Sequence, residues 1–264
     1  MTKPSWFSIP QLVSCRLKIE RANENIRNLE SEIGPFLQTN ANCLFSEEDP
    51  KTGHYSMKFV GDVSSVTRFS VLAGEIVYHL RSSLDHLVWR LTNPALHSKH
   101  TSFPIYISDP RKHPKPNVLK GYERKIEGVS STARAIIERM QPYHRATPVN
   151  DPLAIINELN VKDKHHELAV TFVRAKVTAL IYNDSLGRVL NPPGALSSLR
   201  VEDGAELFRI VPIIGKMDVK PEVGFYVAFP EIGTWKNESI IPTLVQLCDA
   251  TVNTIEMFAG EKFP

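Results

Sequence analysis

Two stretches of the sequence carry side chains able to do acid–base chemistry: HLRSSLDHLVWRL at residues 79–91 and LNVKDKHHELAV at residues 159–170. Each sets histidine beside acidic and basic residues within an apolar pattern of helical period. A histidine gains or loses a proton near neutral pH, and an arginine or lysine beside it can hold a phosphate group. The two stretches therefore indicate metal-free acid–base chemistry at a phosphate, by His86 together with a histidine of the second stretch.

Helical geometry divides the polar residues of the first stretch into two sets. At about 100° per residue, His79 and His86 fall on one flank of the apolar stripe, with Glu75 close to them. Arg81 falls on the other flank, next to Asp85, and these two predict an ion pair one helical turn apart. Arg81 and His86 are about 140° apart on a straight helix, so they are not expected to contact one phosphate.

The second stretch places polar side chains where its helix should be apolar. Asp163 and His166 fall in the middle of the stripe that contains Ile155, Leu159 and Val170. A buried carboxylate or imidazole is costly unless it has a partner. Either the two pair with each other as a structural pair, or they meet the histidine flank of the first helix and form a site at the crossing of the two helices.

The same residues also admit a metal site, with carboxylate and imidazole ligands from facing helices, as in metal-binding bundles. The candidate ligands are Glu75, His79, His86, Asp163 and His166. The paired Glu-x2-His motifs typical of such bundles are absent from the sequence, and so are a glycine-rich phosphate loop and a nucleophile elbow. We therefore expect no metal and no cofactor, and a helical-bundle metalloprotein stays an alternative.

A basic segment, DPRKHPKPNVLKGYERK at residues 109–125, lies in the long connection after the first stretch. Lys112, Lys115 and Arg124 are its candidate binding residues, because clustered cations attract a polyanion such as RNA. The other interpretation is a solvated loop, since loops are commonly charged.

The composition bounds the class of protein. The chain has 264 residues, 42% hydrophobic and 23% charged, as in ordinary globular proteins, and its net charge of +2 gives no overall basic field for nucleic acid. No apolar run is long enough to span a membrane, and the first residues lack the pattern of a secretory signal. Cys15, Cys43 and Cys248 are far apart, which favours a reducing compartment, and we expect a cytoplasmic protein.

The elements that must position these residues follow from the period of the apolar residues. The sequence predicts helices over 9–34, 66–92, 130–141, 151–174 and 238–259, a hairpin over 43–63, and strands over 176–184, 205–213 and 223–231. The first helix has an apolar residue at every seventh position from Leu12 to Ile33, which predicts packing in a bundle, and Gly34 and Pro35 should end it.

This order of elements predicts an α+β fold, mainly a bundle of long amphipathic helices with a small antiparallel β-sheet. We expect a single domain over residues 1–264. Its parts are a helical core over about 9–174, a strand-rich segment over 176–230 and a C-terminal helix over 238–260 that packs back on the core.

Four segments in order resemble a group of uncharacterised bacterial proteins. They are LRSSLDHL (80–87), FPI (103–105), KIEGVSSTARAIIERMQPY (125–143) and LNVKDKHHEL (159–168). Members of that group show an LRSxLDH segment, an FPI piece, a QPY that ends a helix and a DKHR-like segment. The resemblance covers residues 70–170, and this sequence has His166 where the group has arginine.

The arginine-x4-histidine of the first segment is similar to the signature of HEPN domains, helical bundles that often act as metal-independent ribonucleases in toxin and defence systems. The resemblance implies that Arg81 binds phosphate and His86 acts as general acid and base, with RNA as partner and a site shared across a homodimer. Ser82 follows the arginine where that signature has Asn, Asp or His.

The predicted function is therefore a HEPN-like, metal-independent ribonuclease. His86 would be the general acid and base, Arg81 and Lys164 would stabilise phosphate charge, and Asp163 would orient a histidine. The resemblance favours His165 for that histidine. The helical period favours His166, so the choice stays open. The alternatives are a non-catalytic interaction or ligand-binding protein with a structural Asp/His cluster, whose partner protein is unknown, and the metalloprotein.

Overall fold

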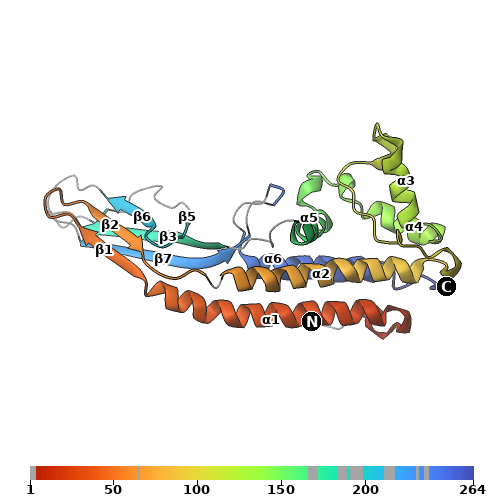
Figure 1. The fold of residues 1–264 in the computed structure, drawn as a ribbon, viewed down its shortest axis with the longest axis horizontal. Helices are drawn as coiled ribbons and strands as arrows, with labels where there is room; N and C mark the ends of the chain where they lie inside the picture. The colour runs from red at the N-terminus through yellow and green to blue at the C-terminus, as the bar shows by residue number, and fades with distance from the viewer. Residues whose placement is uncertain are drawn as a thin grey trace.

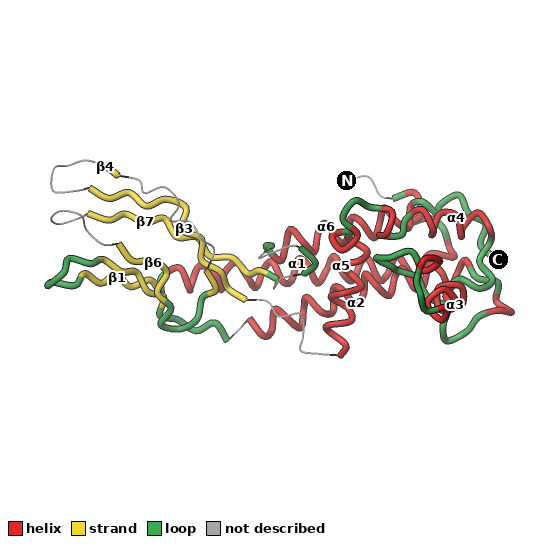
Figure 2. The backbone as a smooth tube through the Cα atoms, turned by 90° about the horizontal axis from the view of Figure 1, so that it is seen from above, coloured by secondary structure: helices red, strands yellow, loops and turns green. Residues whose placement is uncertain are grey.

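The computed structural model describes residues 4–64, 66–165, 172–183, 189–190, 199–210, 218–229, 232–234 and 238–264. The fold is α+β and mainly helical, as predicted. The molecule is elongated, with the helices gathered at one end and the strands extending from the other (Figures 1 and 2).

Two long antiparallel helices form the base of the helical end, α1 (Val13–Ala41) and α2 (Val66–Leu91). The stripe predicted on the first helix is buried between them, from Leu12 through Ile19 and Ile26 to Ile33. The bundle packing inferred from that stripe is therefore confirmed.

The end predicted for the first helix is wrong. α1 passes through Pro35 and ends only at Ala41. Immediately after the proline, Phe36 packs edge-on against Phe69 of α2, with ring centroids 5.2 Å apart, and farther along Asn40 is buried. This packing offsets the backbone hydrogen bond that the proline removes.

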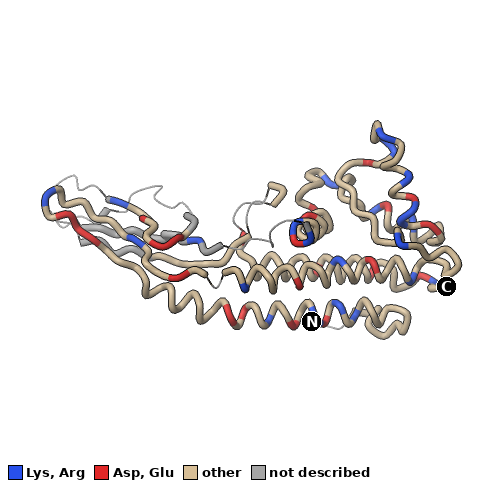
Figure 3. Tube along the Cα trace, viewed as in Figure 1, with Lys and Arg blue, Asp and Glu red and all other residues tan. Residues whose placement is uncertain are grey.

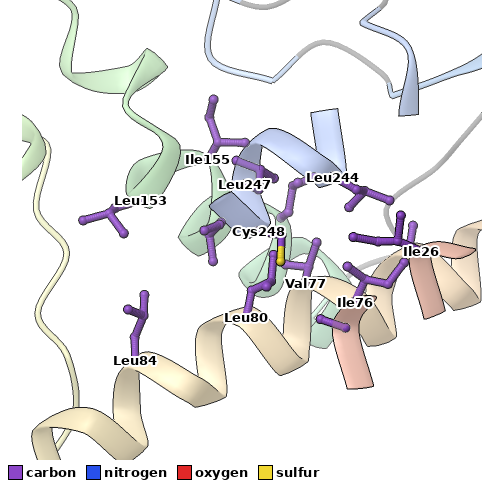
Figure 4. Packing of buried hydrophobic residues seen from close by; sticks show 14 of the residues in the cluster. Ile26, Ile76, Val77, Leu80, Leu84, Leu153, Ile155, Leu244, Leu247 and Cys248 are labelled. Atoms are coloured by element: carbon purple, nitrogen blue, oxygen red, sulfur yellow. The ribbon is translucent and has the colours of Figure 1, made fainter. Parts of the chain in front are cut away.

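Two further helices, α5 (Pro152–His165) and α6 (Ile240–Glu256), cover α2. Figure 4 shows the shared core, in which Leu247 and Cys248 of α6 lie beside Leu80 of α2 and Ile155 of α5. α5 ends at His165 and a strand has begun by Phe172, so the helix predicted over 151–174 is too long.

Two short helices, α3 (Pro116–Lys125) and α4 (Ser131–Arg139), project beside the C-terminal end of α2 (Figure 1). α3 was not predicted, because its apolar residues are few and its basic ones many. Short 3₁₀ turns connect the elements, at Ser5–Ser8, Pro10–Leu12, Pro94–Leu96, Pro110–Lys112, Pro142–His144 and Pro148–Asn150.

The strands form two antiparallel sheets. The predicted hairpin is present as β1 (Leu44–Glu48) and β2 (Tyr55–Phe59), and β6 (Glu206–Ile210) extends it. In the second sheet, β3 (Phe172–Asn183) pairs along its length with β7 (Asp218–Ala228). β4 (Val189–Leu190) and β5 (Leu199–Arg200) add short edges to β3. The three predicted strands thus overlap β3, β6 and β7.

The helices and the cysteines bear on where the protein could reside. Among the described residues, no helix combines the length and apolar character that a membrane span requires. All three cysteines are unpaired, with Cys15 and Cys248 buried and Cys43 half-buried.

Candidate functional site

Arg81 is a buried residue with defined partners. Its Nη2 donates to the backbone carbonyl of Phe103 (2.8 Å), and its Nη1 forms an ion pair with Asp85 Oδ1 (2.7 Å). The same carboxylate oxygen accepts the backbone N–H of Phe103 (2.9 Å). The predicted Arg81–Asp85 pair is confirmed, and together the two side chains hold both backbone polar groups of Phe103.

Gln141 holds two further residues of the same segment, Pro104 and Tyr106. It is fully buried, its Nε2 donates to the carbonyl of Pro104 (2.8 Å), and its Oε1 accepts the backbone N–H of Tyr106 (3.1 Å). The LRSSLDHL, FPI and QPY segments therefore meet at one place. We call the set Arg81, Asp85, Phe103, Pro104 and Gln141 the FPI junction. Its side-chain hydrogen bonds satisfy buried backbone groups of an irregular segment.

The structure does not bring Arg81 and His86 into one site. Arg81 faces the FPI junction, whereas His86 faces a pocket whose lining includes Ser14 at the start of α1. Asp85 contributes to both, because it pairs with Arg81 and also lines the pocket. The separation of Arg81 from His86 is the one expected for residues about 140° apart on a straight helix. A phosphate held jointly by Arg81 and His86 of one chain, as the HEPN resemblance implies, has no geometric support.

His86 lines a pocket of about 320 Å³. The described lining residues come from α1, α2 and the connection after α2, and they are Ser14, Asp85, His86, Trp89, Arg90 and Thr101. We call this the His86 pocket. Arg90 lies one helical turn after His86 in this pocket. It is exposed, and it makes no hydrogen bond or ion pair with any described residue. Arg90 was not among the predicted site residues, although the sequence shows it four residues after His86.

The His86 imidazole is half-buried and lies near charges of both signs. Its Nδ1 is buried without a hydrogen-bond partner in the described structure. Burial lowers the pKa of His86, the charges of Lys18 and Arg90 lower it further, and Asp85 opposes them. The imidazole is therefore mainly uncharged at neutral pH, and it lies near two cations and the Asp85 carboxylate, whose charge is paired with Arg81.

An aromatic side chain completes the His86 pocket. Trp89 is 41% exposed, and one face of its ring stacks on His97 with the centroids 3.9 Å apart. The Nε2 of His97 also lies 2.9 Å from the Trp89 carbonyl oxygen, which fixes the stack. A rigid, partly exposed indole is a surface on which a planar ring can stack.

The other residues of the histidine flank face α1. Glu75 accepts a hydrogen bond from Nδ2 of Asn25 (3.1 Å). Burial lowers the pKa of His79, as do Lys18 and Arg21, against the opposing charge of Glu75. The flank was correctly grouped from the sequence, but it was expected to meet Asp163, and it lies against the first helix instead.

Asp163 lies at a different level of α2. Its carboxylate packs against Gly74 so closely that a Cβ at that glycine would clash with it. Gly74 precedes His86 by twelve residues, or about 18 Å along a helix. Asp163 therefore does not orient His86 within one chain, and the predicted shared site is corrected. Burial raises the pKa of Asp163, and its Oδ1 has no hydrogen-bond partner among the residues described.

Lys164 is likewise remote from the His86 pocket. Its Nζ lies 5.8 Å from the centre of the Tyr78 ring, and Nζ of Lys18 lies 5.0 Å from the same ring. His165 is the last residue of α5 and its side chain is outside the described part of the structure, as is the whole of His166. The choice between these two histidines is therefore untested.

The basic segment lies on the projecting end of the molecule. Lys112, Lys115 and Arg124 are exposed, in and just before α3, where Figure 3 shows several basic positions. Of the residues that the structure describes around the His86 pocket, none is among these three. The segment is therefore a separate surface, and its second half is helix α3 rather than the predicted loop.

The described ranges contain no group of three or more His, Cys, Asp or Glu that could hold a metal ion. The facing ligands proposed from the sequence are divided between the α1 side of α2 and the level of Gly74. The described residues thus give a metal site no support.

Comparison of the chain with known proteins gives no family: no family model, no curated protein and no solved structure matches it. The likeness to the bacterial group and to HEPN domains therefore rests on sequence segments alone and stays a prediction.

Proposed function

We propose that this protein is a non-catalytic binding protein whose His86 pocket takes a nucleotide unit, with RNA as the expected macromolecular ligand. One observation carries the proposal: a half-buried histidine, an exposed arginine and a partly exposed tryptophan line one pocket, while Arg81 is occupied at the FPI junction. The anionic phosphate suits Arg90 and the imidazole edge of His86, and the planar base suits Trp89.

A metal-independent ribonuclease is the second candidate. The observation in its favour is the lowered pKa of His86, because an uncharged imidazole at an open pocket can accept a proton. It would need another cation in the role that the resemblance gives to Arg81, and Arg90 is the cation within the pocket.

The test combines cleavage and binding in excess EDTA. A single-stranded RNA is incubated with the wild-type protein and with His86→Ala, and uridine 5′-monophosphate is titrated into both by calorimetry. The proposal expects intact RNA, saturable nucleotide binding by the wild type, and an affinity at least about tenfold weaker in His86→Ala.

Two further variants, one in the pocket and one outside it, distinguish loss of binding from loss of fold. Arg90→Ala should weaken nucleotide binding to a similar degree, because the residue is exposed and its removal leaves the helix intact. Arg139→Ala, on the exposed face of α4, should change nothing. RNA cleavage that His86→Ala abolishes without lowering the melting temperature would establish the ribonuclease instead.

The proposed compartment remains the cytoplasm. The unpaired Cys15, Cys43 and Cys248 support it, because free thiols persist in reducing surroundings.

A further inference from the structure

A second cavity, of about 540 Å³, lies between α3 and α4, on the part of the molecule that projects beside α2 (Figure 1). Its described lining is part apolar and part charged, and consists of Pro110, Arg111, Leu119, Tyr122, Glu123, Ile126, Arg134, Ala135 and Glu138. The volume suits a small molecule. Its described residues are all different from those of the His86 pocket, so this cavity is an independent site.

One wall of the cavity is a saturated network around Glu138. This carboxylate pairs with Arg111 Nη2 (2.8 Å), accepts the hydroxyl of Tyr122 (3.0 Å) and lies 3.4 Å from His144 Nε2. Burial opposes its ionisation, but neighbouring phenols and Arg111 outweigh burial and lower the pKa of Glu138. Arg111 also pairs with Asp109 (2.8 Å). This wall is therefore fixed, and the charge of Arg111 is already balanced.

Unlike Arg111, Arg134 has no carboxylate partner among the described residues. Its Nε donates to the backbone carbonyl of Val129 (2.9 Å), which anchors the half-buried side chain. In the described part of the chain, its two terminal nitrogens have no hydrogen-bond or ion-pair partner. A guanidinium with an anchored stem and open N–H groups is suited to bidentate binding of a planar anion.

We propose that this cavity binds a small carboxylic acid with an apolar body. The carboxylate would pair with Arg134, and the body would lie against Leu119, Ile126 and Ala135. A singly charged carboxylate fits better than a phosphate, because Glu123 lines the cavity together with Glu138, and two carboxylates repel a doubly charged head more strongly.

The surrounding surface favours the approach of such an anion. Lys112, Lys115 and Arg124 are exposed on the same projecting segment. Their positive potential raises the local concentration of anions without selecting among them. The proposal thus gives the basic segment a role in attracting the acid, while selection depends on Arg134 and the apolar walls.

The test uses three probes with eight carbon atoms each, titrated into the full-length protein by calorimetry. Octanoate should bind saturably at one site, octyl phosphate more weakly, and octanol, which lacks the charge, more weakly still. Arg134→Ala should weaken octanoate binding at least about tenfold, the effect of losing a charge-assisted pair. Arg139→Ala, on the same helix but outside the described lining, should leave the affinity unchanged.

A second variant keeps the test decisive if Arg134→Ala fails to fold. Ala135 is exposed and lines the cavity, so Ala135→Trp fills the space while leaving Arg134 and its anchor in place. Octanoate binding should be lost at an unchanged melting temperature. The proposal is overturned if the wild type does not bind octanoate, if Ala135→Trp binds it as well as the wild type, or if octyl phosphate binds more tightly.

Discussion

The two sides of α2 treat their polar residues in opposite ways. At the FPI junction, Arg81 and Asp85 form an ion pair, and their side chains bond both backbone groups of Phe103. In the His86 pocket, a buried ring nitrogen has no partner among the described residues, and Arg90 is exposed to solvent. Polar groups engaged with partners inside the protein hold the fold, whereas exposed or unpartnered groups that line a pocket are where a ligand can replace water. One stretch of sequence thus contains both kinds, about 140° apart around the helix.

The largest effect is expected from breaking the FPI junction. Arg81→Met leaves the Asp85 carboxylate and the Phe103 carbonyl without their guanidinium partner. The free energy of unfolding should fall by about 2–3 kcal/mol, because the charge-assisted hydrogen bonds of buried Arg81 are lost while Asp85 stays partly solvated. Urea denaturation measures it. Arg90→Met, the matched change on the pocket side, should cost less than about 0.5 kcal/mol. Equal stabilities for the two variants would remove the distinction between the two sides.

A smaller loss of stability is expected where α5 meets α2. Gly74→Ala puts a methyl group where the Asp163 carboxylate lies, and overpacking of this kind costs about 1–3 kcal/mol. Because this contact is about 18 Å along α2 from His86, nucleotide affinity should not change. A variant with wild-type stability, or one with reduced nucleotide affinity, would contradict the placement of Asp163 away from the pocket.

The stability effect of Asp163 should depend on pH. Burial raises the pKa of this carboxyl, so the folded state binds its proton more tightly than the unfolded state does. Its contribution to stability is then greatest below the ordinary carboxyl pKa, about 3.9, and is lost as the pH rises through the raised value. Asp163→Asn should therefore be more stable than the wild type at neutral pH, and the gain should shrink toward about pH 4. A gain that grows on acidification would refute this.

The smallest expected effects are shifts in histidine pKa. They test whether His86, in the pocket, has a different environment from His79 on the same flank of α2. Besides burial, Lys18 lowers the pKa of both His79 and His86, whereas Arg90 acts on His86. Lys18→Met should raise both pKa values toward about 6.5, and Arg90→Met should raise that of His86 alone. NMR titration of the ring protons measures both. Equal responses of the two histidines to Arg90→Met would show that the pocket is not a distinct environment.

Local periodicity was enough to predict α2, its buried stripe and the Arg81–Asp85 pair, because these depend on residues within one or two turns. The partner of that pair was not predictable, since Phe103 lies in an irregular segment after a long connection. For the same reason the passage of α1 through Pro35 was missed, because it depends on the contact of Phe36 with Phe69.

The candidate site was also only partly predictable from local periodicity. A helical wheel correctly separated Arg81 from His86 and grouped His79 with His86. It gives the angle of a residue around the helix but not the level at which a neighbouring helix crosses. The prediction therefore chose the right pair of helices, but Asp163 lies beside Gly74, about three turns before His86.

The most direct test of the account is to follow the nine histidines by NMR while uridine 5′-monophosphate is added in excess EDTA. The account predicts that the His86 ring signals shift most, that His97 follows because it stacks on Trp89, and that the Arg90→Ala variant loses both shifts. The largest shifts at another histidine, or no saturable shift at His86, would contradict the claim that the open side of α2 is the binding site.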